Sequence, residues 1–231
     1  MMSPRYPIPF AVWAIAILLQ AVLLQGCASG PPPSPVELGE TALESGDWRA
    51  AKTHFADALR IDSRSGRAWL GQARAQLAGR DPEGALRSLT SLSKVDRRLF
   101  SEAARSTYAD ALEAATEGRL ARDQSEAALA AVRALSKLEP DRRGLNRLLG
   151  RSLIAEGDRL RWRGDPKSAL ALYSEACRVV PQTLGAWVGA AEILLEFKRG
   201  KEAMQLLEAA RKTHPTAGQI RTLTIQALSL R

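Results

Sequence analysis

The sequence predicts an all-α solenoid, a stack of about five helix-turn-helix units closed by one C-terminal helix. First, apolar residues recur every three or four positions after residue 35, which is the period of an amphipathic helix. Second, runs of β-branched residues are absent and aromatic residues make up only 5% of the chain, so strand signals are lacking. Third, one pattern of small and large residues recurs five times along the chain, which indicates a repeat architecture.

The N-terminal segment, residues 1–26, combines one positive charge with an apolar run and ends beside a cysteine. Arg5 precedes the apolar stretch 8–24, which is shorter than the ~20 residues of a membrane-spanning helix and is typical of a signal peptide. The sequence Leu24-Gln25-Gly26-Cys27 resembles the lipobox, the cleavage site of bacterial lipoprotein signal peptidase. That resemblance implies diacylglycerol on the Cys27 thiol, cleavage before it and a third acyl chain on the new amine. The alternative is an uncleaved signal anchor that a cysteine follows by chance.

Residues 27–35 form the predicted linker, which contains four prolines. Such a run cannot pack inside a helix or a sheet, so it predicts an extended stalk of about 25 Å at roughly 3 Å per residue. Ala28, directly after the lipidation site, differs from the Asp that marks inner-membrane retention in enterobacterial lipoproteins. The resemblance therefore implies an anchor in the outer membrane, with the protein facing the periplasm.

The region 36–215 repeats one pattern in what we expect to be the second helix of each unit. A small residue stands near the helix start, large apolar residues follow, and in three units a proline comes after the helix end. The small residues are Ala51, Ala85, Ala128, Ala169 and Ala203, and the prolines are Pro140, Pro181 and Pro215. Because alanine lets helices approach closely, these positions should face the partner helix, while Phe55, Tyr173 and Trp69 fill the gaps between units. Asp81-Pro82 and Asp165-Pro166 predict helix starts with an Asp N-cap.

These positions resemble the tetratricopeptide repeat (TPR), whose second helix carries Ala, an aromatic residue, Ala and Pro in fixed register. Ala68-Trp69 and Ala186-Trp187 match its first helix. The spacing is 34 residues between the first two repeats and between the last two, as in this family, but 43 and 41 in between. The resemblance implies a TPR solenoid over residues 36–215, with lengthened helices or loops near Gly118 and Gly144. Residues 216–231 are expected to form a capping helix with Ile220, Leu223 and Leu228 on its apolar side.

The sequence offers no constellation of residues for catalysis. His54 and His214 fall in different repeats, and no His or Cys pair has the spacing of metal ligands. With Cys27 lipidated, Cys177 has no partner for a disulfide. We expect Cys177 to be a small buried hydrophobe, with a reactive thiol as the alternative. The sequence therefore predicts no enzyme, no metal site and no cofactor.

The chain is basic, with a formal net charge of +8 and 26 Arg against 7 Lys. Arg143, Arg147 and Arg151 recur every four residues and so are expected to share one helix face. Three interpretations remain: a nucleic-acid partner, an acidic protein or lipid headgroup, and a plain solvated surface. Nucleic acid is disfavoured because an exported chain meets little of it.

In the TPR family the partner-binding groove is lined by the first helices, and this implies a set of candidate groove residues. They are Arg67, Leu70, Arg74 and Leu77 in repeat two, Arg151, Ile154, Asp158, Arg161 and Trp162 in repeat four, and Val188, Glu192 and Leu195 in repeat five. The mixture of Arg with aliphatic residues suits a peptide that carries acidic and apolar anchors. Trp162 is either an anchor in this groove or a residue packed inside repeat four.

A lipid-anchored TPR chain resembles the repeat lipoproteins that serve envelope machines, among them pilotins of type IV pili and the tight-adherence (Flp) pilus assembly lipoproteins. That resemblance implies a scaffold that binds a secretin or a pilus-assembly subunit, and it rests on architecture alone. Two alternatives remain: an adaptor that docks cell-wall hydrolases or proteases, and a subunit of the outer-membrane protein insertion complex.

Overall fold

The computed structural model describes residues 32–230, and every regular element among them is a helix. The first helices of the pairs are α2 (Pro35–Glu44), α4 (Gly66–Ala78), α7 (Arg105–Leu120), α9 (Leu145–Trp162) and α11 (Leu184–Glu196). The second helices are α3 (Trp48–Ile61), α5 (Pro82–Val95), α8 (Ser125–Leu138), α10 (Pro166–Val179) and α12 (Gly200–Thr213). In addition, α6 (Arg97–Ala103) lies between the second and third pairs, and α13 (Gly218–Ser229) follows the last.

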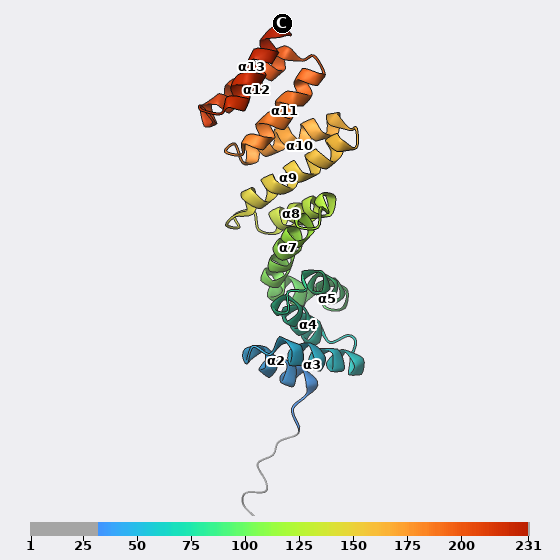
Figure 1. Cartoon of the computed structure of the whole chain (residues 1–231). Coiled ribbons are helices and arrows are strands. Elements are labelled where there is room, and N and C mark those ends of the chain that lie inside the picture. Colours follow the sequence, from blue (N-terminus) through green and yellow to red (C-terminus); the bar gives the residue numbers. More distant parts are fainter. Residues whose placement is uncertain (1–31, 231) are drawn as a thin grey trace, which may run out of the picture.

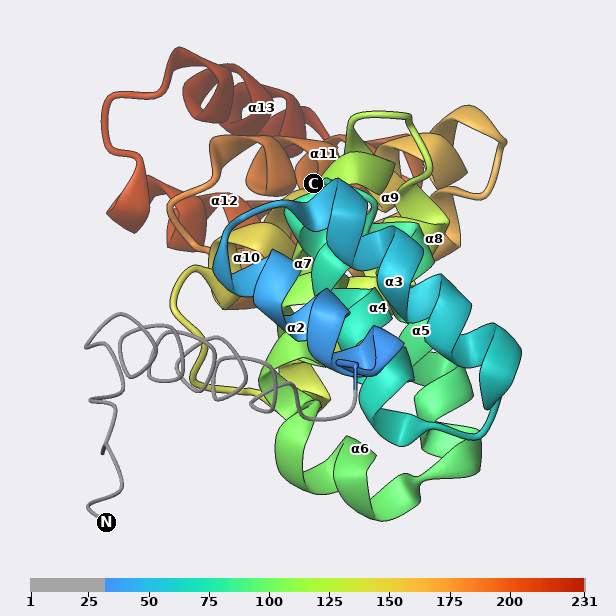
Figure 2. The same cartoon turned by 90° about the horizontal axis from the view of Figure 1, so that it is seen from below.

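The helices stack in chain order into an elongated column, from α2 and α3 at one end to α13 at the other (Figure 1). Seen from below, successive pairs do not superpose, so the column twists (Figure 2). The predicted all-α solenoid of five helix pairs and a closing helix is confirmed. The predicted signal peptide, Cys27 and most of the predicted linker lie outside the described residues. None of the described helices combines the length and the hydropathy needed to cross a membrane.

The predicted helix boundaries follow from capping. The Asp81 and Asp165 carboxylates accept hydrogen bonds from the backbone N–H groups of Gly84 (2.8 Å) and Ser168 (3.1 Å), as the two Asp-Pro motifs predicted. The prolines at 140, 181 and 215 each follow the last helical residue by two positions. Pro35, which we expected in the linker, is instead the first residue of α2, because Ser34 caps that helix in a reciprocal pair with Glu37.

The core of the column depends on aromatic rings that lie against glycines and alanines. Phe55 and Tyr173 are fully buried, as is the small residue that recurs in each second helix. The Tyr173 ring lies between Gly157 on α9 and Gly189 on α11, so close that a Cβ on either glycine would come within 2.9 Å of it. The second helix of repeat four thus packs on both flanking first helices, as expected from the register of small residues.

This packing predicts opposite effects for two glycines of α11. Gly189→Ala places a methyl group 2.8 Å from the Tyr173 ring, and such overpacking should cost about 1–3 kcal/mol. Gly185→Ala meets no atom within 4 Å and should stabilise the helix by about 0.5–1 kcal/mol, because alanine loses less backbone entropy. Thermal unfolding of the two variants measures both. Equal shifts for the two would show that α10 and α11 do not pack as described.

The unusual repeat spacings have a structural cause that the sequence showed only in part. The spacing of 43 residues arises largely from α6, which was not predicted as an element and which lies at the rim of the column (Figure 2). Asp96 ends α5 and caps α6 by accepting from the Leu99 N–H (2.8 Å). Gly118 lies inside α7, whereas Gly144, with φ of +82°, precedes a long α9. Arg143 therefore lies before the helix, and the prediction that it shares a face with Arg147 and Arg151 was wrong.

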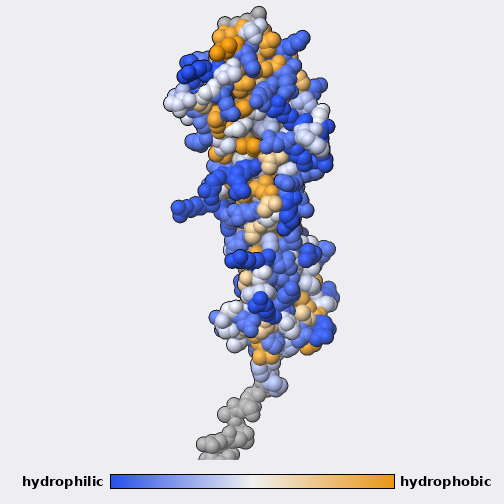
Figure 3. All heavy atoms as spheres, viewed as in Figure 1, coloured by the Kyte–Doolittle hydropathy of each residue, from blue (hydrophilic) through white to orange (hydrophobic). Residues whose placement is uncertain are grey.

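The closing helix α13 buries a narrower stripe than we expected. Ile220, Leu223 and Ala227 are buried against the last repeat, but Leu228 is 48% exposed and Ile225 is 64% exposed. The spacing of the buried residues is three and four, so Leu228 falls outside the stripe. Hydrophobic surface accordingly gathers at the C-terminal end of the face in Figure 3.

Candidate partner-binding surface

The predicted groove residues of repeat two lie together on what we call the first-helix face, the surface that α2, α4, α7, α9 and α11 share. Arg67, Leu70 and Arg74 line a hollow of about 220 Å³, together with Glu40 and Leu43 from α2. Leu70 is buried while the two arginines are exposed. Arg67 pairs with Glu40 (2.8 Å), but Arg74 has no acidic partner among the described residues. Leu77 is half-buried and does not line this hollow.

The groove residues of repeats four and five meet across α9 and α11. Arg161 pairs with Glu192 and Glu196, each at 2.5 Å, and Asp158 accepts a hydrogen bond from the Tyr173 hydroxyl (2.5 Å). The remaining positions are half-buried aliphatics and one exposed arginine: Ile154, Val188, Leu195 and Arg151. Arg161 was expected to be a solvated groove residue. It is instead an ion-pair tie between two repeats, because both carboxylates of α11 lie beside it.

Repeat three contributes an acidic segment to this face that we did not predict. Asp110, Glu113 and Glu117 on α7 occupy the positions that Arg67, Leu70 and Arg74 occupy on α4. Arg142 bridges Asp110 (2.6 Å) and Glu113 (2.6 Å), whereas Glu117 is exposed and forms no ion pair with a described residue. The sequence contained a signal for these acidic residues, because adding the repeat spacing of 43 residues to the groove positions of repeat two leads to them. The face therefore alternates in charge, basic in repeats two and four and acidic in repeat three.

Trp162, the last residue of α9, is 88% exposed. Of the two interpretations of this residue, packing inside repeat four is wrong, because the side chain is almost fully exposed. A large exposed indole next to a charged surface is the type of side chain that dominates many protein interfaces. Trp162 thus stays a candidate anchor for a partner.

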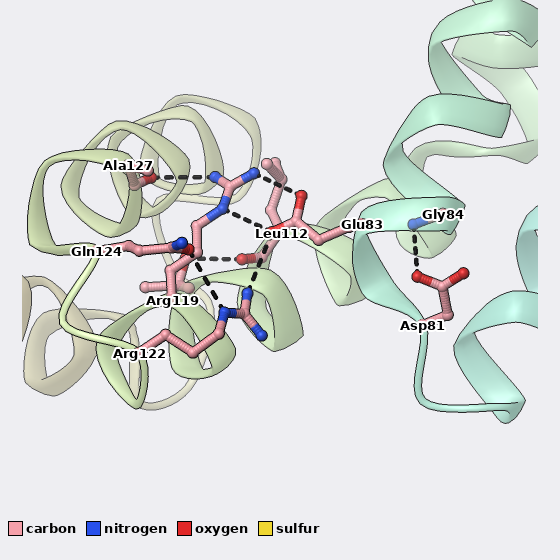
Figure 4. Close-up of polar contacts among 9 residues, drawn as sticks. Asp81, Glu83, Gly84, Leu112, Arg119, Arg122, Gln124 and Ala127 are labelled. Atoms are coloured by element: carbon pink, nitrogen blue, oxygen red, sulfur yellow. Dashed lines mark hydrogen bonds and ion pairs between the residues drawn. The ribbon is translucent and has the colours of Figure 1, made fainter.

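Most of the remaining arginines that form ion pairs tie neighbouring repeats together. In addition to the pairs above, Arg119 grips Glu83 of repeat two through two hydrogen bonds of 2.8 Å and also donates to the Ala127 carbonyl (3.0 Å), as Figure 4 shows. Arg122 lies beside them, 3.7 Å from Glu83. These residues line a hollow of about 850 Å³, which also includes Arg159. Because its arginines mostly face carboxylates of the protein itself, this hollow is a set of inter-repeat ties.

Glu156 is the most deeply buried member of these ties, 5% exposed. It accepts hydrogen bonds from Ser125 of the preceding repeat (2.8 Å) and from Arg159 (2.7 Å). The hydrogen bond from Arg159 is the main cause that lowers the pKa of Glu156, against the opposing effect of burial. The pKa of Glu83 is lowered in the same way by Arg119.

These shifts predict loss of stability in acid. A carboxyl group whose pKa is lower in the folded state stabilises the fold above its ordinary pKa of about 4.3, and this contribution disappears as the pH falls further. Glu156→Gln should cost about 1–3 kcal/mol at pH 7, since it removes a charged hydrogen-bond partner. The difference from the wild type should shrink as the pH falls below the ordinary carboxyl pKa, because the unfolded chain then takes up the proton first, and it should vanish once Glu156 is also protonated in the fold. Melting curves between pH 3 and pH 7 test this, and a difference that does not depend on pH would contradict it.

The described residues contain no group of three or more His, Cys, Asp or Glu side chains that could hold a metal ion. Cys177 is buried, and burial raises the pKa of its thiol to about 12. A thiol of this kind is a poor nucleophile, so the structure supports a packing role for Cys177.

A column of helix pairs with an exposed, charged first-helix face defines a helical-repeat scaffold, a class of proteins that bind other proteins. Two models of the tetratricopeptide repeat match the chain, one at residues 36–92 and the other at residues 163–226, together about half of it. The chain belongs to the tetratricopeptide-repeat family. A search of curated proteins found no match.

Solved structures with the same fold are distant in sequence. A TPR repeats protein from Bacteroides fragilis is similar over 88% of this chain and 100% of its own, with a TM-score of 0.58 at 12% identity. A thermophilic TPR protein from Thermus thermophilus (84% and 97% covered, 22% identity) has a TM-score of 0.34. The TPR2AB domain of yeast Sti1, solved as a complex with pHSP90 (84% and 84% covered, 15% identity), has a TM-score of 0.38. At these identities the similarity shows the fold alone.

Proposed function

We propose that this protein is a lipid-anchored scaffold at the periplasmic side of an outer membrane, where its first-helix face binds a protein partner and assists the assembly of an envelope machine. Pilus or secretin biogenesis is the first candidate. The anchor rests on the Leu24–Cys27 motif, and the interaction role rests on the repeats.

One observation carries the choice of surface. In repeats two and four the first-helix face presents Arg74 and Arg151, which are exposed and have no acidic partner among the described residues. Most other arginines near this face are neutralised by carboxylates of the neighbouring repeat. Beside Arg74 lies the 220 Å³ hollow with Leu70 at its base. Free charge next to a small apolar hollow is what an acidic peptide with an apolar anchor requires.

Reversal of both charges, Arg74→Glu with Arg151→Glu, tests this surface. Since solvated arginines contribute little to folding, melting should change by less than about 1 kcal/mol. Capture of the partner by crosslinking in membranes should fall roughly tenfold or more at low salt, because an acidic ligand loses attraction and meets repulsion. Arg161 is left unchanged because it stabilises the fold through Glu192 and Glu196.

The matched control is Arg178→Glu with Arg211→Glu, which makes the same change of charge on exposed positions of α10 and α12. Capture of the partner by this control variant should stay at the wild-type level. Equal loss in both double variants would mean that net charge, and not this face, determines binding. The identity of the captured protein separates a secretin or pilus subunit from a cell-wall hydrolase or an outer-membrane insertion complex.

A further inference from the structure

A second hollow, of about 550 Å³, lies on the other side of α4, between the second helices α3 and α5. We call it the second-helix groove. α3 and α5 both pack against α4, which forms the floor with Trp69, Gln72 and Gln76. The groove is within the size range of natural ligand sites. The groove is separate from the first-helix face, because different residues of α4 line the two surfaces. Arg67, Leu70 and Arg74 lie on the first-helix face. Trp69, Gln72 and Gln76 line the groove.

Gln72 gives this groove an unmet hydrogen-bond requirement. The side chain is only 8% exposed, yet its Oε1 atom is buried with no partner, the one such side-chain atom among the described residues. Buried polar atoms are almost always paired, since an unpaired acceptor has lost water without replacement. In repeat four the equivalent position is Glu156, which accepts hydrogen bonds from Ser125 and Arg159. Gln72 thus places beside the groove an acceptor that no described residue pairs.

Gln76 lies one helical turn further along the same groove and offers the complementary group. Its Oε1 accepts a hydrogen bond from the Ser88 hydroxyl (2.7 Å), which leaves its amide N–H groups as donors. Four residues of helix separate the two side chains by about 6 Å along α4. An extended peptide advances roughly 6.6 Å over two residues and presents backbone N–H and C=O groups toward the same side. The acceptor and the donor therefore match the spacing of an extended backbone.

The rim of the second-helix groove carries a positive charge that favours an acidic ligand. Arg87 is exposed and forms no ion pair with a described residue, whereas Arg60 is held by Asp57. Leu59 and Trp69 add apolar surface, and the Trp69 indole is fixed because its N–H donates to the Ser63 carbonyl (2.9 Å). We infer that the second-helix groove binds an extended peptide segment of a protein partner, with Gln72 accepting a backbone N–H, Gln76 donating to a backbone C=O and Arg87 pairing with an acidic side chain.

Phage-displayed random dodecapeptides, selected on the purified full-length protein, provide the probe. Selected peptides are then synthesised and their affinities measured by fluorescence anisotropy. Gln72→Met should weaken binding roughly tenfold, because the acceptor is lost without a change in size. Ala56→Trp, at an exposed position that lines the groove, should abolish binding by filling it. Arg87→Glu should weaken binding and its salt dependence.

Two measurements make the test decisive. Arg74→Glu alters the first-helix face of the same helix, so it should leave the affinities for the selected peptides unchanged. Whether Arg74→Glu weakens capture of the partner in membranes tests the proposed function and is independent of the peptide result. Gln72→Met should melt at or above the wild-type temperature, since it removes an unpaired buried acceptor. The inference is overturned if no selected peptide responds to Gln72→Met and Ala56→Trp, or if the peptides respond only to Arg74→Glu. A large loss of stability in Gln72→Met with unchanged affinity would also overturn it, because the amide would then be a structural group paired with water.

Discussion

Ala169→Arg should unfold repeat four and split the melting transition of the whole column. Ala169 is fully buried and packs in one cluster with Tyr173, Ala190 and Ile193. An arginine there must either displace these side chains or bury an unpaired charge, and each alternative costs on the order of several kcal/mol. In a solenoid each repeat contacts only its neighbours, so loss of repeat four separates repeats one to three from repeat five. We therefore expect two melting transitions in this variant. The first should have a lower midpoint temperature than the wild type, and the second should come from the N-terminal repeats.

Ala171→Arg is the matched control for this variant. It lies on the same helix, two residues further along, and is exposed. Its melting curve should stay within about 0.5 kcal/mol of the wild type, as for most surface substitutions. Ala128→Arg and its exposed neighbour Ala130→Arg repeat the comparison in α8. Similar melting of the buried and the exposed variants would mean that the recurring alanines do not mark the packed side of the second helices.

The fold could be predicted because its determinants are local and repeated. Each second helix carries a fully buried alanine, and two of these helices begin with an Asp cap followed by a proline. Signals of this kind depend on residues that are near one another in the sequence. The short helix α6 had no such support. This helix has seven residues and occurs in one repeat only. Asp96 both ends α5 and caps α6.

The function of the arginines could not be predicted in the same way. The sequence is compatible with an acidic partner and with a plain solvated surface, and the structure shows a further role, since Arg119, Arg142 and Arg161 tie neighbouring repeats together. Composition cannot distinguish these from Arg74 or Arg151, because the pairing depends on how one repeat is rotated against the next. A partial signal exists. The arginine and the carboxylate of these ties are separated by 29 to 36 residues, close to one repeat period.

The division of the arginines into paired and unpaired groups bears directly on function. An arginine that already holds a carboxylate offers little to a ligand, because a new contact would have to compete with an existing charged hydrogen bond. Arg74, Arg87 and Arg151 are exposed without such partners. Arg74 lines the hollow on the first-helix face, and Arg87 lines the second-helix groove. Arg151 lies on the first-helix face of repeat four. A scaffold with two charged surfaces can hold two segments of one partner, or two partners, at a fixed distance.

Loss of the proposed lipid anchor should have the largest effect on the protein in the cell, and Cys27→Ser is the change that tests it. One acyl chain binds a membrane only marginally, whereas two or more hold a protein stably, at about 0.8 kcal/mol for each buried CH₂ group. A serine cannot accept the thioether-linked diacylglycerol. The variant should therefore either keep residues 1–26 as an uncleaved precursor or leave the outer-membrane fraction.

Metabolic labelling with an alkyne fatty acid measures the modification itself. Labelling should disappear in Cys27→Ser and persist in Cys177→Ala, which removes the second of the two cysteines in the chain. Cys177 is buried and its thiol pKa is raised by burial, so it should not become acylated in the folded protein. Normal labelling of Cys27→Ser would show that this residue is not the lipidation site. The repeats would then keep their fold and their surfaces, but the proposed location at the membrane would lose its basis.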